Sequence, residues 1–182
     1  MNILQFGFVI VFLSTVANAE TSGLPFVSNA GCNEGPMAQF GQYLGDWKIE
    51  DSKLSQETGE WEPGQGARWI FTCLGDGTAI QDFWIPPGGP VGTNLRTYDN
   101  DTKSWDIAWA IKGVPGFAHI VARQNDSGEI VMKYESPVPN PPRKITFFPV
   151  IDEGWNWKLE LSFDGGNNWT EVYRIKATNF GP

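Results

Sequence analysis

Residues 154–163 read GWNWKLELSF, an alternation of apolar and polar side chains that runs through the whole segment. The apolar set consists of Trp155, Trp157, Leu159, Leu161 and Phe163. Between them stand Asn156, Lys158, Glu160 and Ser162. Successive side chains of a β-strand point to opposite faces, so a period of two is typical of a half-buried strand. The alternation therefore predicts a strand whose tryptophan face packs on a core.

The same period recurs in residues 104–111, where Trp105, Ile107, Trp109 and Ile111 alternate with Asp106, Ala108 and Ala110. Turn residues divide the rest of the chain into further short apolar segments, which predicts ten strands in all. These strands are expected at about 46–54, 66–74, 78–85, 93–99, 104–111, 116–124, 129–135, 143–150, 154–163 and 169–177. Short turns between successive strands favour an up-and-down meander.

Two connections are longer and rich in proline, residues 86–90 and 137–142. Proline removes backbone donors and keeps these segments out of the sheet, so they are suited to frame an opening. Helical periodicity is nearly absent, and the best helix candidate is the short stretch from Pro36 to Leu44. We therefore expect an all-β fold, a single antiparallel meander β-barrel of about ten strands with a short N-terminal helix. Closing the sheet removes its exposed edges, which favours a barrel over an immunoglobulin-type sandwich.

The first residues carry the features of a signal peptide. An apolar run from Phe6 to Val16 precedes Ala17-Asn18-Ala19, which places small residues where signal peptidase cleaves. The run is too short to span a bilayer. We therefore expect cleavage after Ala19, a barrel domain over residues 20–182, and an exported protein, either periplasmic or secreted.

Charge and cysteine content limit the partners. The formal net charge is −8, and a surface of this sign repels nucleic acid and anionic lipid, so neither nucleic acid nor membrane binding is expected once the leader is removed. Cys32 and Cys73 are the only cysteines, and an oxidising compartment favours a disulfide between them over two free thiols. With a single histidine, the sequence contains no recognisable metal site, and no cofactor is expected.

Several segments resemble a known family. Gly45-Asp46-Trp47 opens the first predicted strand and resembles the Gly-X-Trp pattern of calycins, the lipocalins and their relatives. Residues 79–84 (AIQDFW) and 94–99 (NLRTYD), which lead to Trp105 and Trp109, resemble the uncharacterised lipocalin-like family DUF1579. The resemblance covers most of the chain after the leader and implies a barrel. That family has no agreed activity, and the second and third lipocalin motifs have no match here, so it assigns no catalytic residue.

The residues expected to contact a ligand are aromatic side chains and one arginine, namely Trp84, Arg96, Tyr98, Trp109 and Trp157. Arg96 and Tyr98 share one strand face, and an arginine in an aromatic cavity can orient a polar ligand group. The structural alternative is that Arg96 packs on Trp47 at the barrel end.

Three residues are candidates for acid or base chemistry. Asp82, if it faces inward, needs a partner, and Arg96 in the next strand is the nearest candidate. An Asp82–Arg96 pair is favoured over a general base. His119 is the lone histidine, suited to proton transfer or haem ligation, or a simple polar surface residue. Glu171 shares a predicted face with Tyr173 and Ile175, so it is a further candidate inward carboxylate.

Three functions remain open at this point. The first is an exported barrel that binds a small apolar or amphipathic molecule. The second is an enzyme on the same scaffold, an isomerase, cyclase or hydratase with one acid or base. The third is a packed barrel that contacts a protein partner or stacks carbohydrate on surface tryptophans. The first hypothesis requires a cavity, and the sequence does not determine the oligomeric state.

Overall fold

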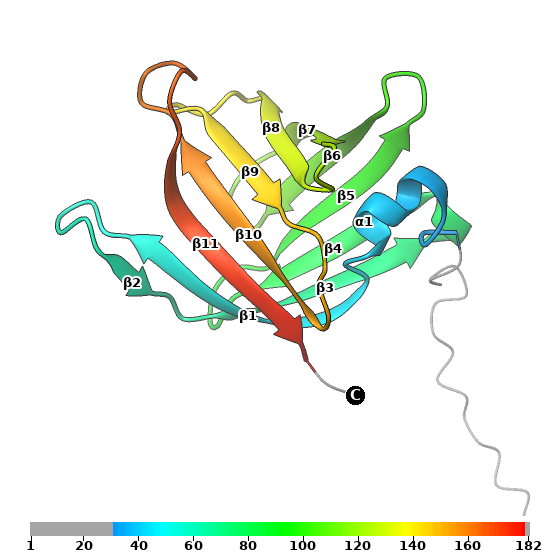
Figure 1. The fold of residues 1–182 in the computed structure, drawn as a ribbon, viewed down its shortest axis with the longest axis horizontal. Coiled ribbons are helices and arrows are strands. Elements are labelled where there is room, and N and C mark those ends of the chain that lie inside the picture. Colours follow the sequence, from blue (N-terminus) through cyan, green and yellow to red (C-terminus); the bar gives the residue numbers. More distant parts are fainter. Residues whose placement is uncertain (1–30, 181–182) are drawn as a thin grey trace, which may run out of the picture.

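The computed structural model describes residues 31–180, which form a barrel with a short helical segment at one end (Figure 1). The helical elements are η1 (Gly35–Met37), α1 (Ala38–Gly41) and η2 (Gly75–Gly77). The strands are β1 (Gly45–Leu54), β2 (Trp61–Pro63), β3 (Ala67–Leu74), β4 (Ala79–Ile85), β5 (Gly92–Asp99), β6 (Ser104–Ile111), β7 (Ala118–Gln124), β8 (Ile130–Ser136), β9 (Arg143–Phe147), β10 (Gly154–Leu161) and β11 (Thr170–Asn179).

The strands surround the barrel in chain order, and every neighbouring pair is antiparallel. Pairing of β1 with β11, from Trp47 opposite Asn179 to Lys53 opposite Tyr173, closes the ring. Ten strands form this closed ring, and they correspond to the ten predicted strands. The all-β meander barrel is thus confirmed. Because the ring is closed, its strands have no long unpaired edge.

Strand β2 is an addition that the sequence did not predict. It pairs only with the last residues of β1, Ser52 to Leu54, and lies outside the ring. Three residues ending in Pro63 are too few to show a period of two. Trp61 is held there by the Arg174 guanidinium, whose central carbon lies 3.8 Å from the ring centroid.

The helical segment plugs one end of the barrel and is shorter than the predicted stretch, since α1 ends at Gly41. Phe40 and Tyr43 enter the interior and are fully buried. The Phe40 ring meets the ring of Trp105 edge-on, with centroids 4.9 Å apart. Two indole groups donate hydrogen bonds to this segment: Trp47 Nε1 to Tyr43 O (2.7 Å) and Trp105 Nε1 to Gln39 Oε1 (2.9 Å). The plug is therefore joined to the barrel by both apolar and polar contacts.

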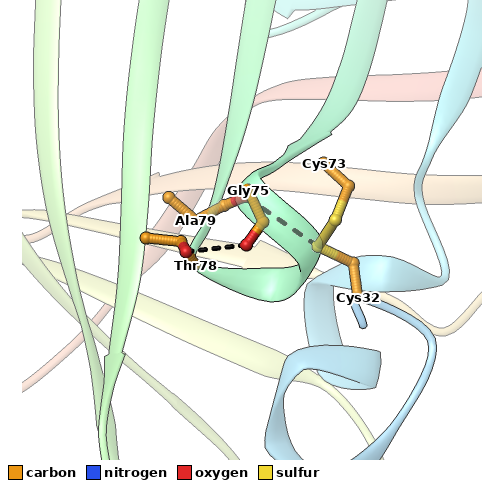
Figure 2. The surroundings of a disulfide bond; sticks show 5 residues. All are labelled: Cys32, Cys73, Gly75, Thr78 and Ala79. Carbon is orange, nitrogen blue, oxygen red and sulfur yellow. Dashed lines mark hydrogen bonds between the residues drawn. A yellow bond between two sulfur atoms is a disulfide. The ribbon is translucent and has the colours of Figure 1, made fainter. Parts of the chain in front are cut away.

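A disulfide between Cys32 and Cys73 anchors the N-terminal arm to the end of β3 (Figure 2), which confirms the predicted pairing. Both residues are fully buried. Next to the bridge, Thr78 Oγ1 donates a hydrogen bond to Gly75 O (2.7 Å) and closes the turn between β3 and β4. Gly41 lets the arm approach α1, because a Cβ atom at this position would lie 1.7 Å from Cys32 O.

The alternation in β10 holds where it faces the barrel interior. Trp155 and Trp157 are buried, and Leu159 and Leu161 are half-buried near the opposite end. Phe163 does not continue the pattern, because β10 ends at Leu161 and the Phe163 side chain is 68% exposed. The predicted strand was too long by the two residues that enter the turn.

The predicted signal peptide, residues 1–19, lies outside the described residues. Among residues 31–180, no helix has the length and apolar character needed to cross a membrane.

Candidate functional site: an aromatic cavity in the barrel

A cavity of about 300 Å³ occupies the barrel interior on the side away from the α1 plug. Aromatic side chains form a large part of its wall, and these residues are Trp69, Trp84, Trp109, Tyr134, Phe147, Trp157 and Tyr173. Aliphatic side chains, among them Ile111, Ile120 and Met132, complete the apolar wall. The polar groups on the wall are few, which is the usual composition of a small-molecule site.

The meander determines where the cavity opens. The β4–β5 and β8–β9 connections lie at the same end of an up-and-down barrel, opposite the β3–β4 turn beside the plug. These are the two proline-rich loops. Pro86 and Pro87 line a second, outer hollow together with Asp51 and Tyr173, and Tyr173 and Trp84 also line the inner cavity. The proline-rich end is therefore the mouth of the barrel.

Four of the five residues expected to contact a ligand line this cavity: Trp84, Arg96, Trp109 and Trp157. Tyr98 does not. It lies toward the plugged end of β5, where its ring packs edge-on against Trp105 at 5.3 Å between centroids. The inward face was predicted correctly, but the cavity does not extend as far as Tyr98 because the plug and Trp105 fill that end.

Arg96 and Asp82 form the buried ion pair that the sequence favoured, between Arg96 Nη2 and Asp82 Oδ2, with neither side chain exposed. The register brings them together, since β4 pairs with β5 and Asp82 lies opposite Asn94. Asn94 supports the carboxylate through its backbone N–H (3.2 Å to Oδ1) and through its side-chain amide (3.1 Å to each oxygen). Asp82 is thus fully engaged and lies behind Arg96 and Asn94, both of which face the cavity.

Aromatic rings surround the Arg96 guanidinium. Its central carbon lies 4.7 Å from the centroid of Phe40, 5.3 Å from that of Phe71 and 6.0 Å from that of Phe147. Burial lowers the pKa of Arg96 from its ordinary value, and the nearby Asp82 carboxylate opposes this effect. Arginine remains charged in proteins, so cation–π contacts and the ion pair together hold a charged group inside the barrel. Packing of Arg96 on Trp47 was the structural alternative in the sequence analysis. The rings that pack on Arg96 are instead those of Phe40, Phe71 and Phe147.

Some donors in the interior have no acceptor among the described residues. They are Arg96 Nε and Nη1, and the indole nitrogens of Trp69 and Trp155. Arg96 and Trp69 belong to the cavity wall. Leaving a buried donor unbonded costs about 1–3 kcal/mol, so these groups are places where an acceptor would bind favourably.

His119 lies outside the barrel. Ile120 and Ala122 take the inward positions of β7, so the histidine faces outward with about half of its side chain exposed. Its Nε2 lies 2.9 Å from Asp106 Oδ1. The hypotheses of proton transfer in the cavity and of haem ligation there do not fit this position.

Glu171 also faces outward, which corrects its predicted inward position. The pairing of β10 with β11 shifts between Leu159 and Glu160: Leu159 lies opposite Tyr173, but Glu160 lies opposite Glu171. Val172 is the extra residue of this bulge. Because of it, the residues of β11 that precede Val172 point to the face opposite to the one that a regular strand would give them. Glu160 is on the outward face of β10, where it is largely covered, and the Lys144 and Lys158 ammonium groups lie 3.1 and 3.3 Å from its Oε2. A bulge leaves no clear mark in a sequence.

Several wall residues were missed by the sequence analysis. Trp69 and Asn94 both line the cavity, and neither is among the residues that the sequence predicts to contact a ligand. Tyr134 and Arg143 meet near the mouth, where burial raises the pKa of Tyr134 and Arg143 opposes it. Tyr173 donates a hydrogen bond to Asp51 Oδ2 (2.6 Å); burial, together with this bond, raises the pKa of Tyr173. Cross-strand pairing is what brings these residues to one cavity.

The fold and cavity define a closed, antiparallel, ten-stranded meander barrel, consistent with a calycin-like fold. No family model matches the chain, and comparison with curated proteins finds no match either. Within residues 31–180, no group of three or more histidine, cysteine, aspartate or glutamate side chains is placed to hold a metal ion.

Proposed function

We propose that the chain is an exported, lipocalin-like binding protein that takes up a small apolar or amphipathic molecule in its barrel. The cavity of about 300 Å³ with its aromatic wall is the observation that carries the proposal. This volume is at the lower end of the range for small-molecule sites. At roughly 30 Å³ per water molecule of liquid volume, it has room for a compact ligand of about ten or more non-hydrogen atoms.

Export is supported by the leader-like residues 1–19 and by the buried Cys32–Cys73 disulfide, because disulfides persist in oxidising compartments. The partial resemblance to DUF1579 agrees with a lipocalin-like barrel and adds no function. The mouth between the proline-rich loops supplies the entrance that a ligand needs.

The enzyme and carbohydrate alternatives have less support than the binding protein. None of the three candidate acid or base residues, Asp82, His119 and Glu171, lines the cavity, so the enzyme hypothesis lacks its reactive group. Each of the nine tryptophans lies within the described residues and is buried or half-buried, so none offers a fully exposed face for carbohydrate.

Native mass spectrometry of the purified protein, before and after mild denaturation, is the direct test. A small molecule that leaves on unfolding, with a mass compatible with this volume, is the expected result. Calorimetry with butylbenzene, an uncharged apolar probe, tests the cavity when no natural ligand copurifies.

A cavity-blocking variant supplies the specificity control. Ile111 is half-buried on the wall near the mouth, so Ile111→Trp should weaken butylbenzene binding at least tenfold. Leu95→Trp is the matched control, since Leu95 is 42% exposed on the outer face of β5. Equal binding by both variants and the wild type would show that the probe binds elsewhere.

A further inference from the structure

Arg96 brings unpaired hydrogen-bond donors to the cavity wall without bringing a net charge. Its Nη2 pairs with the Asp82 carboxylate, and both side chains are completely buried, so the two charges cancel locally. Its Nε and Nη1 atoms have no acceptor among the described residues, although Arg96 is part of the cavity wall. The same wall contains the unbonded Trp69 indole nitrogen. The cavity wall therefore contains donors that have no acceptor among the described residues.

A carboxylate is a poor partner for this site. It would place a second negative charge beside Asp82 in an aromatic interior of low dielectric constant, where like charges repel strongly. Asn94 already directs its backbone and side-chain N–H groups at the Asp82 carboxylate, so these donors are not free for a ligand. The second cation on the wall, Arg143, is exposed and lies at the mouth beside Tyr134. A neutral acceptor avoids this charge repulsion and still accepts hydrogen bonds from the unpaired donors.

We propose that the barrel selects an uncharged amphipathic molecule over the carboxylate of the same shape: its carbonyl-type oxygen accepts hydrogen bonds from Arg96, and its apolar body lies among the tryptophans. This proposal rests on the proposed function and specifies its ligand class. The Asp82–Arg96 pair then acts as a neutral donor, and Asp82 is a positioning residue that excludes anions.

Three probes that share a phenylpropyl body test the selection: 4-phenylbutanamide, 4-phenylbutanoate and butylbenzene. They present a neutral acceptor, an anion and no acceptor, and their affinities for the wild-type protein are measured by calorimetry at neutral pH. The amide should bind at least tenfold more tightly than each of the other two, as expected for hydrogen bonds from the buried, unpaired donors of Arg96. Equal or tighter binding of the carboxylate would overturn the proposal.

The pH dependence in the unmodified protein gives a second, independent readout. The groups that face Arg96 are Asp82 and Tyr43, and the cavity also contains Tyr134, Tyr173 and Arg143. If only the protonated acid enters, its apparent affinity should fall about tenfold per pH unit above the ordinary carboxyl pKa of about 4.3. Amide affinity should stay constant over the same range. A flat profile for the acid would mean that the anion binds.

The double variant Asp82→Asn/Arg96→Met identifies the donor, because it removes both charges and leaves neither unpaired. It should lose at least tenfold in amide affinity and keep its affinity for butylbenzene. A purely structural role for the pair would change both affinities together, and unchanged amide binding would also refute the assignment. If butylbenzene binds the wild type but the amide binds no more tightly, only the ligand class is wrong. If no probe binds, the proposed function itself fails.

Discussion

Gly92 determines where the indole of Trp109 lies. A Cβ atom at position 92 would lie only 2.1 Å from Trp109 Cη2. The indole ring therefore occupies the space that the side chain of any residue other than glycine would need at this position. We expect Gly92→Ala to displace the indole, at a cost of about 1–3 kcal/mol in the free energy of unfolding. Denaturant titration measures the loss, and tryptophan fluorescence reports the displacement. In the Gly92→Ala background, Trp109→Phe should recover part of the stability, because phenylalanine lacks the clashing atom; simple additivity would contradict this explanation.

Arg96 illustrates how burial makes one residue depend on another. The single substitution Arg96→Met leaves the Asp82 carboxylate buried without its partner. It should lower the free energy of unfolding by about 3–5 kcal/mol. The double variant Asp82→Asn/Arg96→Met should cost clearly less, since no charge is left unpaired. Urea unfolding of the single and double variants checks the difference. Equal losses would mean that packing of the arginine on Phe40, and not the charge pair, dominates.

At the scale of elements, the N-terminal plug depends on its covalent link to β3. Cys32 and Cys73 are 41 residues apart, and a loop of this size should contribute about 3–4 kcal/mol by the loop-entropy estimate. The Cys32→Ser/Cys73→Ser variant should show this loss in denaturant titration. Its stability should not respond to a reductant, whereas the wild type should approach the variant when reduced. A reductant effect that persists in the variant would contradict this origin.

The β10–β11 turn is organised by one carboxylate. Asp164 accepts hydrogen bonds from the backbone and side chain of Asn168, the backbone of Asn167 and the Ser162 hydroxyl. These bonds, the Asn168 backbone first, lower the pKa of Asp164 to about 2 from an ordinary 3.8. Because the folded-state pKa is depressed, its contribution is complete above pH 3.8 and disappears as the pH falls through about 2.

Amide exchange of Asn167 and Asn168 should therefore accelerate, relative to the intrinsic rate, as the pH falls from about 4 to about 2. In Asp164→Asn the protection should be weak throughout and should show no transition in this range. The Asp99 turn, whose carboxyl pKa is lowered by Thr102 and Asp101, serves as an internal comparison within the same spectra. A transition that survives in Asp164→Asn would assign it to another group.

At the scale of the whole molecule, closure makes β11 indispensable, because it joins β10 to β1. Truncation after Asn168 should expose the edges of both neighbours and abolish cooperative thermal unfolding. Replacing residues 55–65 with a short turn removes β2, which lies outside the ring, and should leave cooperative unfolding in place. Calorimetric scans of both variants distinguish the two roles. A cooperative transition in the truncated chain would show that closure is not essential.

The general architecture and part of the cavity could be predicted from local patterns. Alternation in residues 104–111 and 154–163 identified inward tryptophans, and Trp84, Arg96, Trp109 and Trp157 do line the cavity. Tyr98 was assigned to the correct face but to the wrong end, since nothing in the sequence shows how far the plug reaches. Trp69 and Asn94 were missed because their role comes from neighbours on other strands.

The sequence by itself determined the ten ring strands, their antiparallel meander, the disulfide and the Asp82–Arg96 pair, because each follows from periods, turns or residues on adjacent strands. Only the tertiary structure decided that Glu171 faces outward and that phenyl rings of α1, β3 and β9 enclose Arg96. The cavity inside the barrel also became apparent only there. A bulge shifts a face by one residue, and a cavity is the volume that side chains from many strands leave unfilled. Both depend on contacts between distant segments, which no local pattern contains.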